Sequence, residues 1–332
     1  MSVKPAITLL GGKSKLAARI ISHFPPHHTY VELFAGTAAV LLAKPPAKVE
    51  LINDIDGDLV NLYRVLRDPL LSKRLKDACD STLCSRAEFD LAKAPADDPL
   101  ERARRFMVRQ RMSYGGMGEQ WSWSVSDSRL GMDNSVRRWQ AGAERFDSIH
   151  KRLRRVQIEQ SDWRILLSRY DSPRTLFYLD PPYIPATRIG GSYSYELSQD
   201  DHEDIVARLL GIEGMAVISG YVHEAYEPLE AAGWVKHSFN LPAFTSDKRT
   251  RRSECLWISP SIEAAKAAAP NPMRLGALLT HKSRVASTEL KLKSAIRRIQ
   301  SAGRRVTVTA VARTAGLSRG HVSRRYHHLL PA

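Results

Sequence analysis

Asp180, Pro181, Pro182 and Tyr183 form the tetrapeptide of this chain best suited to chemistry. They follow residues 175–179, an apolar run that predicts a buried strand, so the carboxylate should stand at a strand end on a stiff turn. Neither proline donates a backbone hydrogen bond, which leaves the Pro181 carbonyl and the Asp180 carboxylate as neighbouring acceptors. Two acceptors beside an aromatic ring suit an exocyclic amino group on a flat base that stacks on that ring.

The amino nitrogen of such a base is a poor nucleophile, because its lone pair is delocalised into the ring. Acceptors that take both of its hydrogens favour a tetrahedral nitrogen, ready for in-line attack on an electrophilic methyl group. This chemistry requires no metal. The alternative is that the tetrapeptide is only a turn after a strand, because short motifs also match by chance.

Two earlier segments predict the elements of a cofactor site. Residues 30–42 predict a strand that turns at Gly36 into an apolar helix, similar to a dinucleotide-binding unit without its three-glycine fingerprint. Residues 49–55 predict a strand that delivers Asp54, an acid placed to hold the two hydroxyls of a ribose. A glycine turn without a phosphate loop, together with a ribose acid, favours S-adenosylmethionine over NAD.

Residues 7–15 add two glycines and Lys13 at the start of a helix. Glycines allow close approach of the backbone to a ligand, and the lysine offers a charge there. The alternative is an ordinary glycine turn before a helix.

Strands alternate with helices over most of the chain. This pattern predicts an α/β fold with a doubly wound, mainly parallel sheet, in which ligands bind at the carboxyl ends of the strands. Asp54, Asp162 and Asp180 all fall at such ends, so one cleft could gather them. The five later strands are expected at residues 156–159, 175–179, 215–219, 234–241 and 254–259.

Residues 65–155 predict arginine-rich helices around an irregular segment at 113–123. Basic side chains with interleaved aromatics suit phosphate contacts and base stacking. The alternative for any single residue is a solvated helix face or a buried tryptophan. We predict that this insert separates the two parts of a catalytic domain, residues 1–64 and 156–260.

The C-terminal part is strongly basic, because residues 271–332 hold 13 Lys and Arg and one acid, Glu289. The Ala- and Pro-rich segment 261–285 predicts a linker. Residues 286–332 resemble a helix-turn-helix DNA-binding module, with Gly316 at the turn. The alternative is a basic helical hairpin that contacts protein.

The amino-acid composition indicates which class of partner this chain binds. The chain has 50 Lys and Arg against 35 Asp and Glu, a net charge of +15, which favours nucleic acid over a membrane as partner. Its three cysteines have no histidines at metal-ligand spacing, and no apolar run predicts a signal sequence or a membrane span. We expect a cytoplasmic protein of a bacterial cell, encoded by the cell or by a phage, and the sequence indicates no oligomeric state.

The order of these segments resembles that of the Dam-type N6-adenine DNA methyltransferases over about residues 5–260. The resemblance implies the seven-stranded fold of S-adenosylmethionine-dependent methyltransferases and methyl transfer to a flipped adenine in duplex DNA. It also implies that the insert recognises the target, and it leaves open whether a cognate restriction enzyme is a further partner. Three departures stand at Leu9, where the family often has tryptophan, at residues 36–38 of the glycine run, and at residues 114–116 of the insert.

The predicted sites are as follows. The resemblance assigns catalysis to Asp180, Pro181, Pro182 and Tyr183. The cofactor residues are expected to be Leu9, Gly12, Lys13, Glu32, Phe34, Gly36, Asp54, Asp162 and Asp180. The DNA contacts are expected to be Arg109, Arg111, Tyr114, Arg137, Arg138, Ser318, Arg319, His321, Arg324 and Arg325.

Two rival functions stay open. One is methylation of another amino group, on cytosine N4, an RNA base or a protein amide, by the same turn. The other is a DNA-binding regulator that keeps the fold without turnover. The intact tetrapeptide argues against the second rival.

Overall fold

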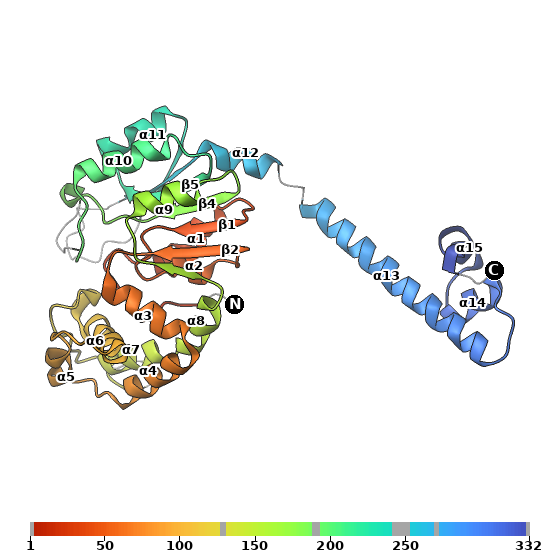
Figure 1. Ribbon diagram of the computed structural model, residues 1–332, viewed down its shortest axis with the longest axis horizontal. Coiled ribbons are helices and arrows are strands. Elements are labelled where there is room, and N and C mark those ends of the chain that lie inside the picture. Colours follow the sequence, from red (N-terminus) through yellow and green to blue (C-terminus); the bar gives the residue numbers. More distant parts are fainter. Residues whose placement is uncertain (1–2, 127–130, 188–192, 241–252, 269–271, 330–332) are drawn as a thin grey trace. The chain divides into compact units, whose positions relative to one another are not determined.

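A computed structural model describes residues 3–126, 131–187, 193–240, 253–268 and 272–329 (Figure 1). The chain divides into two compact units, Met1–Ala267 and Ala268–Ala332. Each has a hydrophobic core of its own.

The first unit is built around a seven-stranded sheet in the order β3-β2-β1-β4-β5-β7-β6. β7 is antiparallel to both of its neighbours, while the other paired strands run parallel. The predicted mainly parallel, seven-stranded α/β fold is thereby confirmed. The strands are β1 (Thr29–Glu32), β2 (Val49–Asn53), β3 (Gln157–Glu159), β4 (Thr175–Leu179), β5 (Met215–Tyr221), β6 (Val235–Asn240) and β7 (Ser253–Ile258).

Helices cover both faces of the sheet, so successive residues of the central strands are buried on opposite sides. Tyr30 and Tyr178 belong to one core cluster, whereas Val31 and Phe177 belong to the other. The first face is covered by α1 (Ala17–Ser22), α2 (Ala39–Ala43), α3 (Gly57–Arg67) and α12 (Pro260–Ala268). The second face is covered by α9 (Trp163–Tyr170), α10 (Gln199–Leu209) and α11 (Glu227–Ala231).

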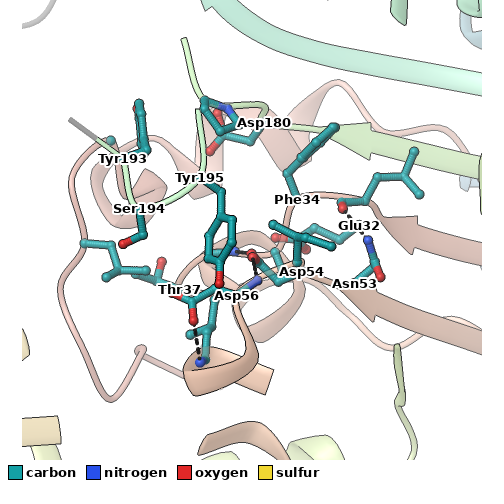
Figure 2. A pocket seen from close by; sticks show the side chains of 18 of the residues that line it. Glu32, Phe34, Thr37, Asn53, Asp54, Asp56, Asp180, Tyr193, Ser194 and Tyr195 are labelled. Carbon is teal, nitrogen blue, oxygen red and sulfur yellow. Dashed lines mark hydrogen bonds between the residues drawn. The ribbon is translucent and has the colours of Figure 1, made fainter. Parts of the chain in front are cut away.

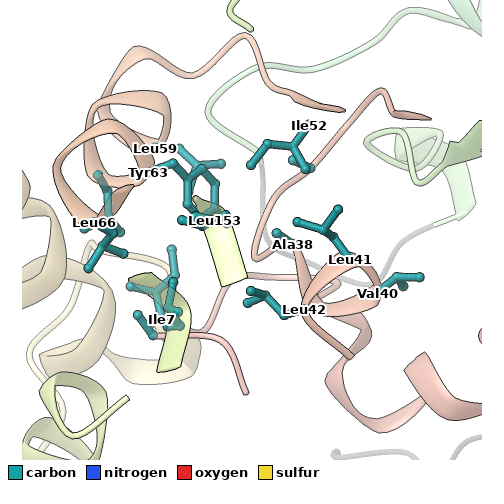
Figure 3. Packing of buried hydrophobic residues seen from close by; sticks show 14 of the residues in the cluster. Ile7, Ala38, Val40, Leu41, Leu42, Ile52, Leu59, Tyr63, Leu66 and Leu153 are labelled. Atoms are coloured by element: carbon teal, nitrogen blue, oxygen red, sulfur yellow. The ribbon is translucent and has the colours of Figure 1, made fainter. Parts of the chain in front are cut away.

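The helices of the insert share one hydrophobic core with the first face of the sheet. Leu59, Tyr63 and Leu66 repeat at helical spacing on α3 and share this core with Leu41 and Leu42 of α2 (Figure 3). The insert helices are α4 (Pro69–Ser81), α5 (Arg86–Leu91), α6 (Pro99–Met112), α7 (Asn134–Ala143) and α8 (Phe146–Leu153). Short 3-10 turns lie at η1 (Lys13–Lys15), η2 (Tyr114–Gly116), η3 (Pro185–Thr187) and η4 (Glu224–Tyr226).

The second unit contains α13 (Pro272–Ser301), α14 (Val308–Ala315), α15 (Arg319–Arg325) and the turn η5 (His327–Leu329). Val311 and Ala312 of α14 and Val322 of α15 pack with Ile296 of α13. Gly316 ends α14 in the left-handed conformation, which glycine adopts at no steric cost. α14 and α15 are two short helices joined at this glycine, and both the helix-turn-helix module and DNA binding by this unit stay predictions.

The segment predicted as a linker, residues 261–285, is helical where the structure describes it, and the boundary between the two compact units falls inside it. α12 occupies its first part, with Ile262 fully buried in the core, and α13 begins at Pro272 instead of near residue 287. Pro260 and Pro272 stand at the first positions of the two helices, where a missing N–H costs nothing. The alanines between them are strong helix formers.

Candidate active site

Asp180 stands directly after β4, in the middle of the sheet between β1 and β5. All five residues of β4 are buried, so packing on both faces holds the strand in register. The carboxylate therefore projects at the carboxyl edge of the sheet, where open α/β sheets bind their ligands. Its side chain keeps 18% of its surface exposed.

Lys13 is the charged partner of Asp180. Its Nζ lies 2.8 Å from Asp180 Oδ1 and 3.1 Å from Glu254 Oε1, and it donates a hydrogen bond to the Gly11 carbonyl at 2.6 Å. The same ammonium lies 4.7 Å from the centre of the Tyr183 ring. Lys13 thereby connects the N-terminal glycine segment to the Asp180–Tyr183 tetrapeptide.

Glu254 is a residue of this cluster that the sequence analysis missed. It comes from β7, is buried, and accepts a hydrogen bond from the Tyr183 hydroxyl. Its signal in the sequence is a single acid at the start of an apolar strand. Such acids are common at strand ends, so the contact with Lys13 becomes visible only in the folded chain.

The ionisation of Asp180 depends on this cluster. Burial raises the pKa of the Asp180 carboxyl to about 6, Glu254 adds to the rise, and Lys13 opposes it. Burial acts to lower the pKa of Lys13, but the carboxylates of Asp180 and Glu254 outweigh it and hold that pKa above its ordinary value. At neutral pH the site is therefore a buried carboxylate beside an ammonium.

A pocket with a volume of about 360 Å³ adjoins Asp180. All nine residues predicted for the cofactor line it, so the structure brings together side chains from five separate segments. Figure 2 shows Glu32 and Phe34 at the end of β1, and Asp54 and Asp56 after β2, around this pocket. Asp180, the first residue of the tetrapeptide, also lines this pocket.

Asp54 braces the glycine turn from the end of β2. Its carboxylate accepts the Gly36 N–H at 2.8 Å and the Asp56 N–H at 3.0 Å. Gly36 has φ +46°, and Ala38 follows with φ +50°, a conformation that costs an alanine about 1–2 kcal/mol. Burial raises the pKa of Asp54 to about 6, although both N–H groups oppose the rise.

Glu32 lines the pocket from the end of β1. The Tyr30 hydroxyl and the Leu41 N–H donate to its Oε2 at 2.8 Å and 3.0 Å. Burial raises the pKa of Glu32 to about 8, so the group holds its proton at neutral pH. It therefore braces α2 against β1 as a neutral acid.

The far wall of the pocket begins at Asp162, which caps α9 by accepting the Arg164 N–H at 2.8 Å. Next to it the Trp163 ring lies 6.1 Å from Phe34. The Trp163 indole N–H is buried and has no hydrogen-bond partner among the described residues. An aromatic pair with a spare donor suits a planar heterocycle.

Residues 193–197 also line the pocket, which the sequence analysis did not predict. The Tyr193 hydroxyl lies against Gly11, where an added Cβ would stand 2.7 Å from it. This position therefore needs glycine, and the two segments together form one wall. Figure 2 shows Tyr193, Ser194 and Tyr195 on this segment.

The predicted DNA contacts of the insert divide into two groups. Tyr114 is 68% exposed, and Arg137 is partly exposed beside Glu144. Arg109 pairs with Asp58, while Arg111 is buried. Arg111 and Arg138 each donate to the backbone carbonyl of the other, so in this structure both connect α6 to α7.

In the second unit Ser318, Arg319 and Arg324 are exposed. The side chains of His321 and Arg325 lie outside the described part of the chain.

No helix in the described residues is long and apolar enough to cross a membrane. The described residues also contain no cluster of three His, Cys, Asp or Glu side chains that could hold a metal ion, and metal-free chemistry stays a prediction.

The site thus combines a mainly parallel α/β sheet, a glycine turn, an acid after β2 and an Asp-Pro-Pro-Tyr turn beside the pocket. The chain belongs to the D12 class N6 adenine-specific DNA methyltransferase family, whose model matches residues 10–213. Its substrate is therefore DNA, its product N6-methyladenine, and membership implies the use of S-adenosylmethionine.

Two relatives are type II methyltransferases. The chain is 27% identical to M.MjaIII of Methanocaldococcus jannaschii over 229 residues, which cover 60% of this chain and 77% of that protein. It is 24% identical to M1.LlaDCHI of Lactococcus lactis subsp. cremoris over 219 residues, which cover 62% of this chain and 75% of that protein. Both alignments are shorter than the first unit, which spans 267 residues.

Proposed function

We propose that Asp180 and the Pro181 carbonyl hold the N6 amino group of a flipped adenine in duplex DNA while the methyl group is transferred. The observation that carries this assignment is the place of Asp180, at the border between the cofactor pocket and the buried cluster of Lys13, Glu254 and Tyr183. A carboxylate there faces both reactants.

The pocket residues fit S-adenosylmethionine, which supplies an electrophilic methyl group when bound. The Asp54 carboxylate has acceptor capacity beyond its two backbone donors and is placed for ribose hydroxyls. The buried, unpartnered indole N–H of Trp163 and the Phe34 ring suit the adenine of the cofactor. Glu32 holds its proton at neutral pH, so it adds no charge to the pocket.

The target base would be held by two hydrogen-bond acceptors of this chain. Asp180 and Pro181 accept the two N–H hydrogens, so the lone pair of N6 points at the methyl group. When bound, the cofactor would supply the methyl group to N6 and leave as the neutral thioether, and the proton that N6 loses would pass to the Asp180 carboxylate that accepts it. Tyr183 would stack on the base, which requires Lys13 to leave the ring face that it covers in this structure.

DNA would be held by the insert and by the second unit. Tyr114 and Arg137 are the insert residues best exposed for a base edge or a phosphate. Exposed Arg319 and Arg324 on α15 suit the major groove or its phosphates. A cognate restriction enzyme stays a predicted partner.

Asp180→Asn tests the assignment. We expect methyl transfer to fall about 10²- to 10³-fold, because the amide replaces an ionised acceptor at the reacting nitrogen. The Kd for S-adenosylmethionine, measured by equilibrium dialysis, should stay within about threefold. Asp90→Asn, an exposed acid on α5, is the matched control and should change neither quantity. Complete loss of cofactor binding in Asp180→Asn would contradict the assignment.

A further inference from the structure

His202 lies on α10, behind the catalytic tetrapeptide, and is completely buried. Its Nε2 lies 3.0 Å from the Pro182 carbonyl oxygen, and its Nδ1 lies 2.9 Å from the Tyr226 hydroxyl. Both ring nitrogens therefore have partners, one of them in the tetrapeptide itself.

These partners determine the tautomer of His202. A carbonyl oxygen only accepts, so Nε2 must carry the proton and donate to Pro182. In the neutral ring Nδ1 is then an acceptor, and the Tyr226 hydroxyl donates to it. Burial lowers the pKa of His202 to about 4, so this neutral form is the one present at physiological pH.

The residues around Tyr226 hold its hydroxyl in place. The Tyr226 ring stacks on Trp257 at 4.5 Å, and the Trp257 indole donates to Glu230 at 3.1 Å. A Cβ at Gly220 would lie 3.2 Å from both rings, so the glycine permits this close stacking. The hydroxyl therefore points at His202 from a fixed position.

The tetrapeptide needs such support, because its two prolines have no N–H with which to anchor the turn. The fixed φ of each proline leaves the rotation about ψ as the freedom that sets the Pro182–Tyr183 peptide plane. A hydrogen bond to the Pro182 oxygen restricts that rotation. The hydrogen bond thereby orients the Pro181 carbonyl, which precedes Pro182, and the Tyr183 ring, which follows it.

We propose that His202 is a positioning residue for methyl transfer: as the neutral Nε2–H tautomer set by Tyr226, it holds the Pro182 carbonyl and thus the geometry of the turn. The proposal rests on the function assigned above to Asp180 and Pro181. α10 also contacts the cofactor wall, where Arg164 bonds Asp201 at 2.6 Å and Asp204 at 2.5 Å. The helix thus supports both the cofactor side and the base side of the site.

The test compares full-length variants in single-turnover methylation of unmethylated genomic duplex DNA with labelled S-adenosylmethionine. His202→Leu keeps bulk and removes the donor, and a displacement of about 1 Å at reacting groups can cost about 10²-fold, so a fall of 10- to 100-fold is expected. His202→Gln restores an N–H at similar reach and should return to within about fivefold of wild type. Cofactor Kd should stay within about twofold in both. His150→Leu is the matched control, because His150 bonds the Leu66 carbonyl away from the site.

Tyr226→Phe keeps the stacked ring and removes only the donor to Nδ1. A fall of about three- to tenfold is expected, since His202 can then adopt the tautomer that cannot donate to Pro182. If His202→Leu does not fold, Tyr226→Phe tests the positioning role of His202 instead. Wild-type rates in a folded His202→Leu or in Tyr226→Phe would overturn the proposal, and so would equal defects in the Leu and Gln variants. A wild-type protein that methylates no adenine would instead refute the proposed function.

Discussion

The Lys13 ammonium lies 2.8 Å from the Asp180 carboxylate, so the N-terminal glycine segment and the catalytic tetrapeptide share one buried ion pair. Glu254 contacts the same ammonium at 3.1 Å and provides a second carboxylate for it. The charge state of Asp180 therefore depends on one residue that lowers its pKa and one that raises it. Both effects can be measured separately.

The first prediction concerns the pH dependence of kcat/KM. Ionised Asp180 is a stronger acceptor for the amino group than its protonated form, so activity should rise with pH through about 6 and then level off. Glu254→Gln removes a negative neighbour, which lowers the pKa of Asp180, and the acidic limb should move to lower pH. Lys13→Met removes the cation, and the limb should move to higher pH. Shifts in the same direction for both variants would refute this electrostatic account.

The second prediction concerns Asp54. Asp54→Ala should raise the Kd for S-adenosylmethionine roughly 10- to 100-fold, because hydrogen bonds to a charged group are worth about 1.5–3 kcal/mol. Isothermal titration of the cofactor in the absence of DNA measures the effect directly. Asp90→Ala serves as the control for loss of an acid. An unaltered Kd in Asp54→Ala would remove Asp54 from the cofactor site.

The sequence predicted the residues whose roles follow from local pattern. Asp54 and Asp180 each end an apolar strand, and parallel strands bring their carboxyl ends to one edge, so a shared cleft followed from topology alone. All nine residues predicted for the cofactor line the pocket, and those that follow strands do so for that reason. The seven strands were likewise predicted, although β3 and β6 are mostly polar.

Residues that act through tertiary contacts were missed. Glu254 reaches the site because β7 inserts antiparallel between β5 and β6, and no local pattern specifies that order. In the sequence, His202 is one polar residue on an amphipathic helix. Its contact with the Pro182 carbonyl forms only when α10 packs behind Pro182. Arg111 shows a further limit of local pattern, since an arginine predicted to contact DNA is buried in this structure.

The third prediction concerns stability. Glu32 has a pKa of about 8 in the folded protein against 4.5 ordinarily, so between these values the folded state holds a proton that the unfolded state has lost. Stability should therefore fall as pH rises through this window, by up to about 1.4 kcal/mol per pH unit from this group. Urea unfolding from pH 5 to 9 should show a shallower decline for Glu32→Gln. Parallel curves for the two proteins would mean that Glu32 does not titrate there.

The fourth prediction concerns the second unit. The double change Arg319→Ala and Arg324→Ala should weaken duplex binding and reduce the slope of log K against log salt by about 0.9 for each phosphate that is no longer neutralised. Fluorescence anisotropy at several salt concentrations gives the slope. Arg208→Ala, an exposed arginine on α10, is the control. A slope equal to that of wild type would assign α15 a partner other than DNA.

The most direct test of the central claim is the identity of the methylated base. The full-length protein is incubated with labelled S-adenosylmethionine and unmethylated duplex DNA, and the product nucleosides are separated by chromatography. Label in N6-methyladenine, at least about 10²-fold lower with Asp180→Asn, is the predicted result. Label in N4-methylcytosine, or equal label with the variant, would contradict the role of Asp180 as the acceptor that holds the adenine amino group.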